Sequence, residues 1–293
     1  MKHIFMINRF TLKERLDKYV AAIESAAKAL MLDYKIEINN EEISTEDILK
    51  KYQKSSNIIY AVGGDGILNR TLNAIYGTKN KLGLIPAGTG NDFNRSINEF
   101  FDEGDNLVDV IKCNDKYLIN VACFGVDADI ANDEKIVHNK LIPRKMQYKV
   151  GVAKHICIYK PYNFTLKWNK KSKKYKLSIV TVCNGGYYGG GFHVNPDGIY
   201  NDGLLDAYIV TATNRRQLIS YLLKILKGKH KDSKYVEHVR TDNFTITTEK
   251  PIGGNLDGEL MTTTKFEMKV IPKAITFYNN KELLELINKE LGK

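Results

Sequence analysis

The sequence lacks the cysteine patterns and long apolar runs that mark several common classes of protein. Its four cysteines show no C-x-x-C spacing, which argues against a zinc site or a redox motif and favours reduced cytoplasmic thiols. No apolar run approaches the ~20 residues that a transmembrane helix needs. The apolar stretch at the N-terminus, Met1–Asn8, is too short for a signal peptide and is typical of a first strand. We therefore expect a cytoplasmic protein.

Two common nucleotide-binding motifs are also missing. The sequence has no G-x-x-x-x-G-K-[ST], so it is not a P-loop protein, and no G-x-G-x-x-G follows the first predicted strand. A Rossmann dinucleotide site is therefore not expected. Internal repeats and low-complexity segments are absent as well.

Acidic residues are missing from one long window of a basic chain. The net charge is +10, but Lys135–Lys176 contains 13 Lys or Arg residues and no Asp or Glu, so the rest of the chain sums to −3. Two interpretations remain open. The window is either a solvated surface with a lysine-rich hairpin turn at Asn169–Lys174, or a site for an anionic partner such as a membrane leaflet or a nucleic acid.

The first third of the chain alternates strand and helix patterns. Apolar positions spaced three and four apart follow Thr11, which predicts a helix capped by that residue. Such alternation favours a parallel sheet with helices on both faces, whose ligands bind beyond the carboxyl ends of the strands. The predicted strands are His3–Ile7, Tyr34–Ile38, Asn57–Val62 and Leu82–Ile85, and the later helices are Ser44–Tyr52 and Gly66–Tyr76.

From about Lys116 the pattern becomes rich in β-branched and aromatic runs, which predicts a β-sandwich or distorted barrel. We expect an α/β domain at residues 1–115, a β-rich domain at 116–279, and a C-terminal helix at 280–293 that packs back on the first domain. The predicted strands are Tyr117–Cys123, Phe164–Trp168, Leu177–Val182, Leu205–Val210, Phe244–Thr248, Phe266–Val270 and Ala274–Phe277, with helices at Lys145–Tyr159, Asn214–Lys227 and Asn280–Leu291.

The strongest local signal is the turn Gly63-Gly-Asp-Gly66, which ends an apolar strand and opens a helix. Strand, glycine turn and helix N-terminus is the geometry that binds phosphate, because bare N–H groups and the helix dipole both favour an anion. Asp65 would repel a nucleotide there unless a cation lies between them. It therefore suggests Mg²⁺ or a polar orienting role.

Two further segments complete the pattern. Gly88-Thr-Gly-Asn-Asp92 is a second glycine loop after a strand, and Asp257-Gly-Glu259 lies between two strand patterns. Each could be a simple turn, since Asp-Gly is a common hairpin signal. The four motifs Gly63–Asn69, Pro86–Phe93, Asn195–Asp206 and Asn255–Glu259, in this order, resemble the diacylglycerol kinase catalytic-domain superfamily of lipid kinases.

The resemblance implies a fold and a nucleotide site. The fold would be an N-terminal three-layer α/β domain, like that of NAD kinases and phosphofructokinases, and a C-terminal β-sandwich domain. The nucleotide-binding residues would be Asn8, Gly63, Gly64, Asp65, Gly66, Asn69 and Thr89.

The resemblance also implies catalytic and metal-binding residues. Glu259 would accept the proton of the lipid hydroxyl, Asp257 would position Mg²⁺ or share that role, and Asp65 would also be catalytic. Asp202, with the backbone carbonyls of Ile199 and Leu204, would match a structural Mg²⁺ site.

Two departures from the family pattern concern the nucleotide. Ile67 stands where the family usually has threonine, and Arg9-Phe-Thr-Leu12 replaces the usual proline and glycine-rich turn after Asn8. Arg9 is therefore expected to take over part of the charge role of that loop.

The sequence predicts an ATP- and Mg²⁺-dependent kinase that phosphorylates a lipid hydroxyl, diacylglycerol giving phosphatidic acid. The expected partners are the lipid substrate and the anionic inner face of the membrane, with a homodimer open and no nucleic acid, since no reader motif accompanies the basic window. Two alternatives remain: an NAD kinase-like enzyme, and a non-catalytic membrane-binding module on a kinase fold.

Overall fold

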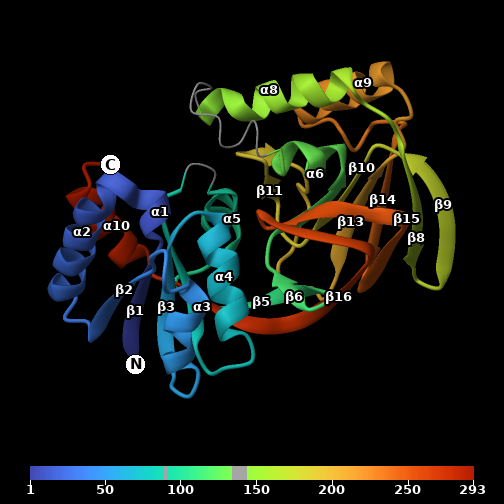
Figure 1. Ribbon diagram of the computed structural model, residues 1–293. Coiled ribbons are helices and arrows are strands. Elements are labelled where there is room, and N and C mark those ends of the chain that lie inside the picture. Colours follow the sequence, from blue (N-terminus) through green and yellow to red (C-terminus); the bar gives the residue numbers. More distant parts are fainter. Residues whose placement is uncertain (89–90, 134–143) are drawn as a thin grey trace. The chain divides into compact units, whose positions relative to one another are not determined.

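The computed structural model describes residues 1–88, 91–133 and 144–293. The chain forms two compact units (Figure 1). Unit 1 comprises Met1–Val110 and Pro272–Lys293, and unit 2 comprises Ile111–Ile271. No helix among the described residues is both long enough and apolar enough to cross a membrane.

Unit 1 is built on a parallel sheet with the strand order β4-β3-β1-β2. The register places Ile7 beside Val62 and Val62 beside Ile85, so β1, β3 and β4 end at the same edge of the sheet. The strands are β1 (Lys2–Ile7), β2 (Tyr34–Ile38), β3 (Asn57–Gly63), β4 (Lys81–Pro86) and β5 (Gly104–Cys113). The helices are α1 (Arg9–Leu12), η1 (Lys13–Arg15), α2 (Leu16–Ala29), α3 (Thr45–Leu49), η2 (Lys50–Tyr52), α4 (Asp65–Ile75), α5 (Asp92–Phe100) and α10 (Lys281–Glu290).

Side chains alternate between the two faces of the buried strands, and this divides the core of unit 1 into two layers. Phe5, Tyr60 and Val62 point toward α2 and α10, where Tyr19 and Leu283 are buried against them. α3 and α4 contact each other, and α4 covers β3 and β4 (Figure 1). The result is the predicted three-layer α/β arrangement, with α10 packed on α2.

The start of the first helix differs from the prediction. α1 begins at Arg9, directly after β1, so Thr11 lies inside the helical turn and the predicted cap at Thr11 is wrong. The Asn8 side chain accepts the Phe10 N–H at 3.0 Å instead. Asn8, the residue directly after β1, therefore supplies the capping hydrogen bond that the sequence pattern assigned to Thr11.

Unit 2 is a β-rich unit, and the pairings among its described strands are antiparallel. The strands are β6 (Lys116–Leu118), β7 (Val121–Gly125), β8 (Tyr162–Trp168), β9 (Lys171–Leu177), β10 (Ile179–Cys183), β11 (Tyr187–Tyr188), β12 (Phe192–His193), β13 (Leu205–Val210), β14 (Val236–Thr241), β15 (Asn243–Leu256) and β16 (Glu259–Asn279). The helices are α6 (Val126–Ala131), α8 (Arg144–Cys157) and α9 (Arg215–Ile225).

The core of unit 2 lies inside the β structure. The rings of Phe124 and Phe266 pack at an angle of 60° with their centroids 4.7 Å apart, and Trp168 stacks on Phe244 at 5.9 Å. A register shift between Thr247 and Ile252 bends β15, so that it pairs with β8 before the shift and with β7 after it. Helices α6, α8 and α9 pack on a separate apolar cluster that includes Ile179 and Tyr221.

Two predictions about this unit need correction. The lysine-rich segment is not one long turn: the turn contains only Asn169 and Lys170, both with positive φ, and Lys171–Leu177 is strand β9. The two strands predicted at the end of the chain form the single strand β16, which begins in unit 2 and ends beside β4 in unit 1. Pro272 lies within β16 without interrupting it.

An ion pair links the end of α6 to α8 and makes unit 2 sensitive to pH. The Asp133 carboxylate accepts from Lys154 Nζ at 2.5 Å and lies 3.0 Å from His155 Nε2. The Lys154 hydrogen bond lowers the pKa of Asp133 below its ordinary value of 3.8. A lowered folded pKa stabilises the fold above the unfolded pKa, and this contribution is lost as the pH falls through the folded pKa.

We therefore expect Asp133→Asn to lower the melting temperature near pH 6 by at most about 4 °C, which corresponds to about 1 kcal/mol or less. The difference between wild type and variant should shrink as the pH falls below 3.8 and through the lowered pKa of Asp133. Melting curves across this range check it. Asp115→Asn, at an exposed aspartate of the same unit with no ion pair among the described residues, is the control. A difference that persists at low pH would contradict the assignment.

Candidate functional site

The first glycine turn is a tight junction between β3 and α4. β3 ends at Gly63, Gly64 is the N-cap and α4 begins at Asp65. The Gly63 carbonyl accepts the N–H groups of Ala87 and Gly88 at 2.8 and 3.1 Å, which holds the second turn against the first. The junction thus has the strand, turn and helix N-terminus geometry that suits phosphate.

The two turns approach so closely that side chains would not fit between them. A Cβ on Gly88 would lie 2.6 Å from the Gly64 Cα, and a Cβ on Gly63 would lie 2.5 Å from the Ile67 Cγ2. Ile67 is buried and packs over the turn. The missing threonine hydroxyl at this position is therefore replaced by apolar packing. Thr89, the predicted phosphate contact of the second loop, lies outside the described residues.

Asp65 fastens the first turn to the next helix. Its carboxylate accepts the backbone N–H groups of Asp92 and Phe93 at 3.2 and 3.1 Å, at the N-terminus of α5. Asn91, with φ +51°, precedes this helix and donates from Nδ2 to the Gly88 carbonyl at 2.9 Å. The geometry supports the orienting role for Asp65, since a carboxylate at a helix N-terminus is stabilised by the dipole.

A third contact joins the end of β1 to the same region. Asn8 donates its N–H to the Val62 carbonyl at 3.3 Å, and Arg15 Nη2 donates to the Ala87 carbonyl at 3.1 Å. The carboxyl ends of β1, β3 and β4 therefore bring Asn8, Gly64 and Ala87 to one edge of the sheet. The predicted nucleotide residues of unit 1 that the structure describes gather there.

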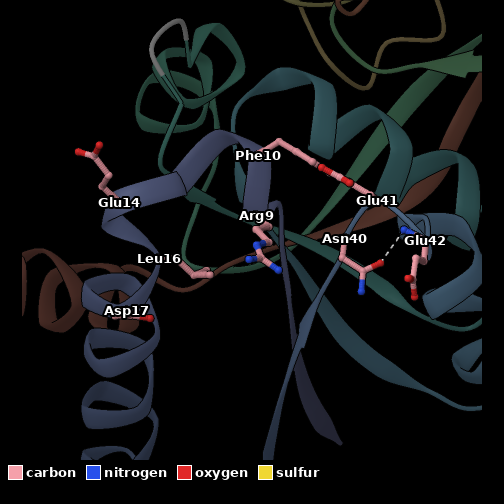
Figure 2. Close-up of a pocket in the computed structure, with 8 residues that line it drawn as sticks. All are labelled: Arg9, Phe10, Glu14, Leu16, Asp17, Asn40, Glu41 and Glu42. Carbon is pink, nitrogen blue, oxygen red and sulfur yellow. Dashed lines mark hydrogen bonds between the residues drawn. The ribbon is translucent and has the colours of Figure 1, made fainter.

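A hollow of about 850 Å³ lies beside the start of α1 (Figure 2). It is lined from α1 and α2 on one side and from the segment after β2 on the other, where the Glu42 N–H donates to Asn40 Oδ1 at 2.9 Å. The lining residues are Arg9, Phe10, Glu14, Leu16, Asp17, Asn40, Glu41 and Glu42. Four carboxylates accompany the single guanidinium of Arg9, so this hollow does not suit a phosphate.

In unit 2 the Asp257-Gly258 pair forms the hairpin turn between β15 and β16. Both residues have positive φ, +48° and +93°, as a two-residue hairpin of this type requires. The buried Asp257 carboxylate accepts N–H groups from Ile119 at 2.7 Å and Val121 at 2.8 Å, and from the residue between them. Asp257 thereby fixes the segment that leads into β7.

Glu259 is the first residue of β16 and pairs with Leu256 across the turn. It is half-buried, and it lies two residues from the Asp257 carboxylate that three backbone amides fix in place. The hairpin holds Glu259 in a rigid position, because strand pairing and the hydrogen bonds from these backbone amides close the turn.

The predicted metal residues lie in the loop before β13 and at its start. Asp202 accepts the Leu204 N–H at 3.0 Å through Oδ1 and pairs with Arg240 through Oδ2. Arg240 Nε also lies 3.4 Å from Asp206, which His238 Nε2 contacts at 2.6 Å. Magnesium requires a near-octahedral set of oxygen ligands, so this arrangement of cations around Asp202 does not fit a metal ion.

Within residues 1–88, 91–133 and 144–293, no group of three or more His, Cys, Asp or Glu side chains could hold a metal ion. The Lys231 ammonium also pairs with Asp197. Lys231 and Arg240 thus pair with the carboxylates Asp197 and Asp202, and His238 contacts Asp206.

The sequence analysis missed an apolar pocket of about 260 Å³ in unit 2. It lies between β10, the β11–β12 pair and the helices α8 and α9, and its lining residues are Asp127, Val152, Ile179, Thr181, Tyr188, Phe192, Val194, Tyr221, Leu222, Ile225 and Leu226. Asp127 supplies the single carboxyl group among these side chains. A largely apolar cavity with one carboxylate suits a ligand with a long apolar part and a polar end.

Burial keeps the other titratable groups around this pocket neutral. Burial raises the pKa of the Tyr221 phenol and of the Cys183 thiol far above their ordinary values. It also raises the pKa of Cys123, whose Sγ lies 2.9 Å from the Tyr188 hydroxyl. These thiols are therefore unreactive packing groups, as the lack of a redox motif indicates.

Asp127 is placed in the pocket by a strand–glycine–helix junction. β7 ends at Gly125, α6 begins at Val126, and the Val126 N–H donates to the Ser178 carbonyl at 3.1 Å. The order of strand, glycine and acid in Phe124–Asp127 repeats that of Val62–Asp65. That local pattern is the signal that could have pointed to Asp127.

These features define a two-domain class of protein, with an α/β unit that carries paired glycine turns and a β-rich unit that carries an apolar pocket. Residues 2–120 match the family model of the diacylglycerol kinase catalytic domain, and residues 120–279 match that of the YegS C-terminal NAD kinase beta sandwich-like domain. The chain belongs to the diacylglycerol kinase catalytic-domain superfamily of lipid kinases. The predicted fold class is confirmed.

Individual relatives agree with this assignment. A protein of Shewanella frigidimarina named "Probable lipid kinase YegS-like" is 29% identical over 73% of this chain and 74% of its own length. A crystal structure described as a diacylglycerol kinase from Bacillus anthracis superposes with a TM-score of 0.74, covering 95% of this chain and 97% of that chain at 23% identity. At that identity the superposition establishes the fold alone.

Proposed function

We propose that the protein is an ATP-dependent lipid kinase that transfers the γ-phosphate to a lipid hydroxyl, with diacylglycerol as acceptor and phosphatidic acid as product. Family membership supports a kinase, and the names of the relatives support a lipid acceptor. The coarser conclusion, a kinase of the lipid-kinase superfamily, follows from the family itself. ATP, the acceptor and the residue roles are our proposal.

The observation that carries the choice of a lipid is the apolar pocket of unit 2. Its wall is formed mainly by aliphatic and aromatic side chains such as Ile179, Phe192 and Leu222. Each methylene that leaves water for such a pocket contributes about 0.8 kcal/mol to binding. A nicotinamide dinucleotide, which is polar along its whole length, would gain little there, so the pocket favours a lipid acceptor over NAD.

The paired glycine turns are the proposed nucleotide site. Gly63, Gly64 and Gly66 leave the backbone bare at the N-terminus of α4, and Asn69 lies one turn into that helix. Asn8 directly follows the neighbouring strand β1, and the Asp65 carboxylate binds the N-terminus of α5 to the turn. In this proposal ATP arrives as its magnesium complex, because the Asp65 and Asp257 carboxylates already accept backbone N–H groups.

The proposed chemistry is a direct transfer to oxygen. The lipid hydroxyl oxygen forms a bond to the γ-phosphorus while the bond between that phosphorus and the β–γ bridging oxygen breaks, and ADP leaves. Glu259 takes the proton of the hydroxyl as general base. Asp257 acts through its amide contacts by keeping the turn that carries Glu259 in place.

Membrane association and a cytoplasmic site of action are part of the same proposal. A bilayer-resident acceptor requires adsorption, and the described part of the basic window, Arg144–Lys176, presents exposed lysines on strand β9 such as Lys171, Lys173 and Lys174. Each basic residue near an anionic leaflet contributes ~1 kcal/mol. Vesicle sedimentation at several salt concentrations tests this adsorption.

The test of function is phosphate transfer from labelled ATP to a panel of acceptors in the presence of Mg²⁺: diacylglycerol, a sphingoid base, ceramide, undecaprenol and NAD. We expect label in phosphatidic acid. Transfer to NAD alone would establish the NAD kinase-like alternative instead. Absence of transfer to every acceptor, with normal folding, would favour a non-catalytic membrane-binding module.

A further inference from the structure

Helix α9 carries apolar side chains on a face that no described residue of unit 2 covers. Ile219, Leu223 and Leu226 are 41%, 54% and 65% exposed. Their spacing of four and three residues places them on one face of the helix. Leu218 and Tyr221, on another side, are buried in the cluster beneath α9. The helix therefore has one apolar side that packs inward and a second apolar stripe that faces outward.

Along the chain, basic residues and no acidic residue flank this stripe. Between Asp206 and Asp232 the chain has six Lys or Arg residues and no Asp or Glu. Arg215, Arg216, Lys227 and Lys229 are exposed, and no carboxylate among the described residues pairs with them. The other two are engaged: Lys224 donates to the Asp232 carbonyl at 3.2 Å, and Lys231 pairs with Asp197.

The stripe is continuous with the apolar pocket. Leu226 belongs to both, since it is exposed on α9 and also lines the pocket beside Leu222 and Ile225. α8, which supplies Val152 to the same pocket, lies side by side with α9 (Figure 1). One helix thus forms a wall of the pocket and carries exposed apolar side chains.

We propose that α9 docks on the surface of an anionic bilayer. Ile219, Leu223 and Leu226 enter the boundary between headgroups and acyl chains, and Arg216 and Lys227 contact lipid phosphates. An exposed apolar stripe flanked by cations is the pattern of helices that lie in a membrane interface. A soluble protein partner would also cover the stripe, but it would not explain the unpaired cations along the same helix unless it were acidic.

The docking surface gives the proposed lipid kinase a route to its substrate. Only this role of the surface rests on the proposed function. The pocket shares α9 with the bilayer surface, so a lipid would move from the leaflet to the pocket along one apolar wall. The docking itself depends on the exposed residues of α9 and not on phosphate transfer.

The test compares vesicle binding of the full chain with that of an Ile219→Gln/Leu223→Gln double variant. Neither residue lines the pocket. We expect wild type to sediment with phosphatidylcholine vesicles that contain phosphatidylglycerol, and the double variant to bind at least about tenfold more weakly. The control is Leu107→Gln/Ile43→Gln, at unit 1 residues 50% and 47% exposed, which should bind like wild type. Melting temperatures confirm that each variant folds.

A charge variant, Arg216→Gln/Lys227→Gln, should also bind about tenfold or more weakly, and its binding should depend less on salt. Docking is overturned if the Ile219/Leu223 variant binds as wild type does. It is also overturned if wild type binds pure phosphatidylcholine equally well, or if the stripe variant only converts a dimer into a monomer. If that variant binds weakly and wild type phosphorylates none of the acceptors, docking stands and the proposed function is overturned. If wild type is an active lipid kinase and the Ile219/Leu223 variant binds vesicles as wild type does, the proposed function stands and docking is overturned.

Discussion

Glu259→Gln should reduce turnover by about 10²–10⁴-fold, which is the usual contribution of a general base. Glutamine has the same shape but cannot take the proton of an acceptor hydroxyl. Because Glu259 is half-buried at the start of β16 and the adjacent turn is fixed by Asp257, the substitution should leave the backbone in place. The Michaelis constant for ATP should stay near the wild-type value, since the proposed nucleotide-binding residues are in unit 1.

Glu267→Gln is the matched control for this substitution. Glu267 lies on the same strand, is exposed and pairs with Lys265 at 2.8 Å. Its variant should keep normal turnover with lipid acceptors. If Glu259→Gln also keeps normal turnover, Glu259 is not the base. If it instead loses activity together with its melting temperature, the residue has a structural role.

Gly125→Ala should destabilise unit 2 by about 3 kcal/mol or more, which lowers the melting temperature by roughly 6–12 °C. Gly125 has φ +84° and ψ −143°, a backbone conformation close to the region that only glycine populates, which costs a residue with a Cβ about 1–3 kcal/mol. A Cβ there would also lie 2.3 Å from the Ser178 carbonyl oxygen, so β7 and β10 would have to move apart. The displaced junction carries Asp127, so lipid acceptors should bind more weakly as well.

Gly190→Ala separates the cost of the backbone conformation from the clash of the added Cβ with Ser178. Gly190 has nearly the same φ, +85°, but a Cβ there would meet nothing within 4 Å. Its variant should lose only the backbone contribution of about 1–2 kcal/mol. Thermal or denaturant unfolding of the two variants measures the difference, which reports the contact with Ser178. Equal stabilities would mean that the β7–α6 junction relaxes without cost.

Local sequence patterns predicted the parts of the fold in which neighbours along the chain decide the structure. The apolar run before Gly63 is a buried strand, the glycines form a turn, and α4 begins at once. Asp257-Gly258 is both a hairpin turn, as its sequence indicates, and a fixed point of unit 2. Each of these features rests on φ preferences or on hydrophobic periodicity within a few residues.

The contacts that give the candidate site its chemistry are distant in sequence, and no local pattern reports them. Asp65 reaches α5 across 27 residues, and Asp257 accepts amides 136–138 residues earlier in the chain. Arg240 and His238 contact the acidic residues Asp202 and Asp206 only because β14 pairs with β13. The resemblance assigned Asp202 to metal binding, and in the fold this carboxylate pairs with Arg240 instead.

The sequence by itself determined the family, the order of the two units and the positions of the glycine turns, because those depend on motifs and on chain-local backbone preferences. Only the tertiary structure decided which face of α9 is left exposed, that Asp127 reaches an apolar pocket, and that Asp65 fastens the first glycine turn to α5. These depend on which surfaces pack against each other, and packing joins residues that the chain keeps far apart.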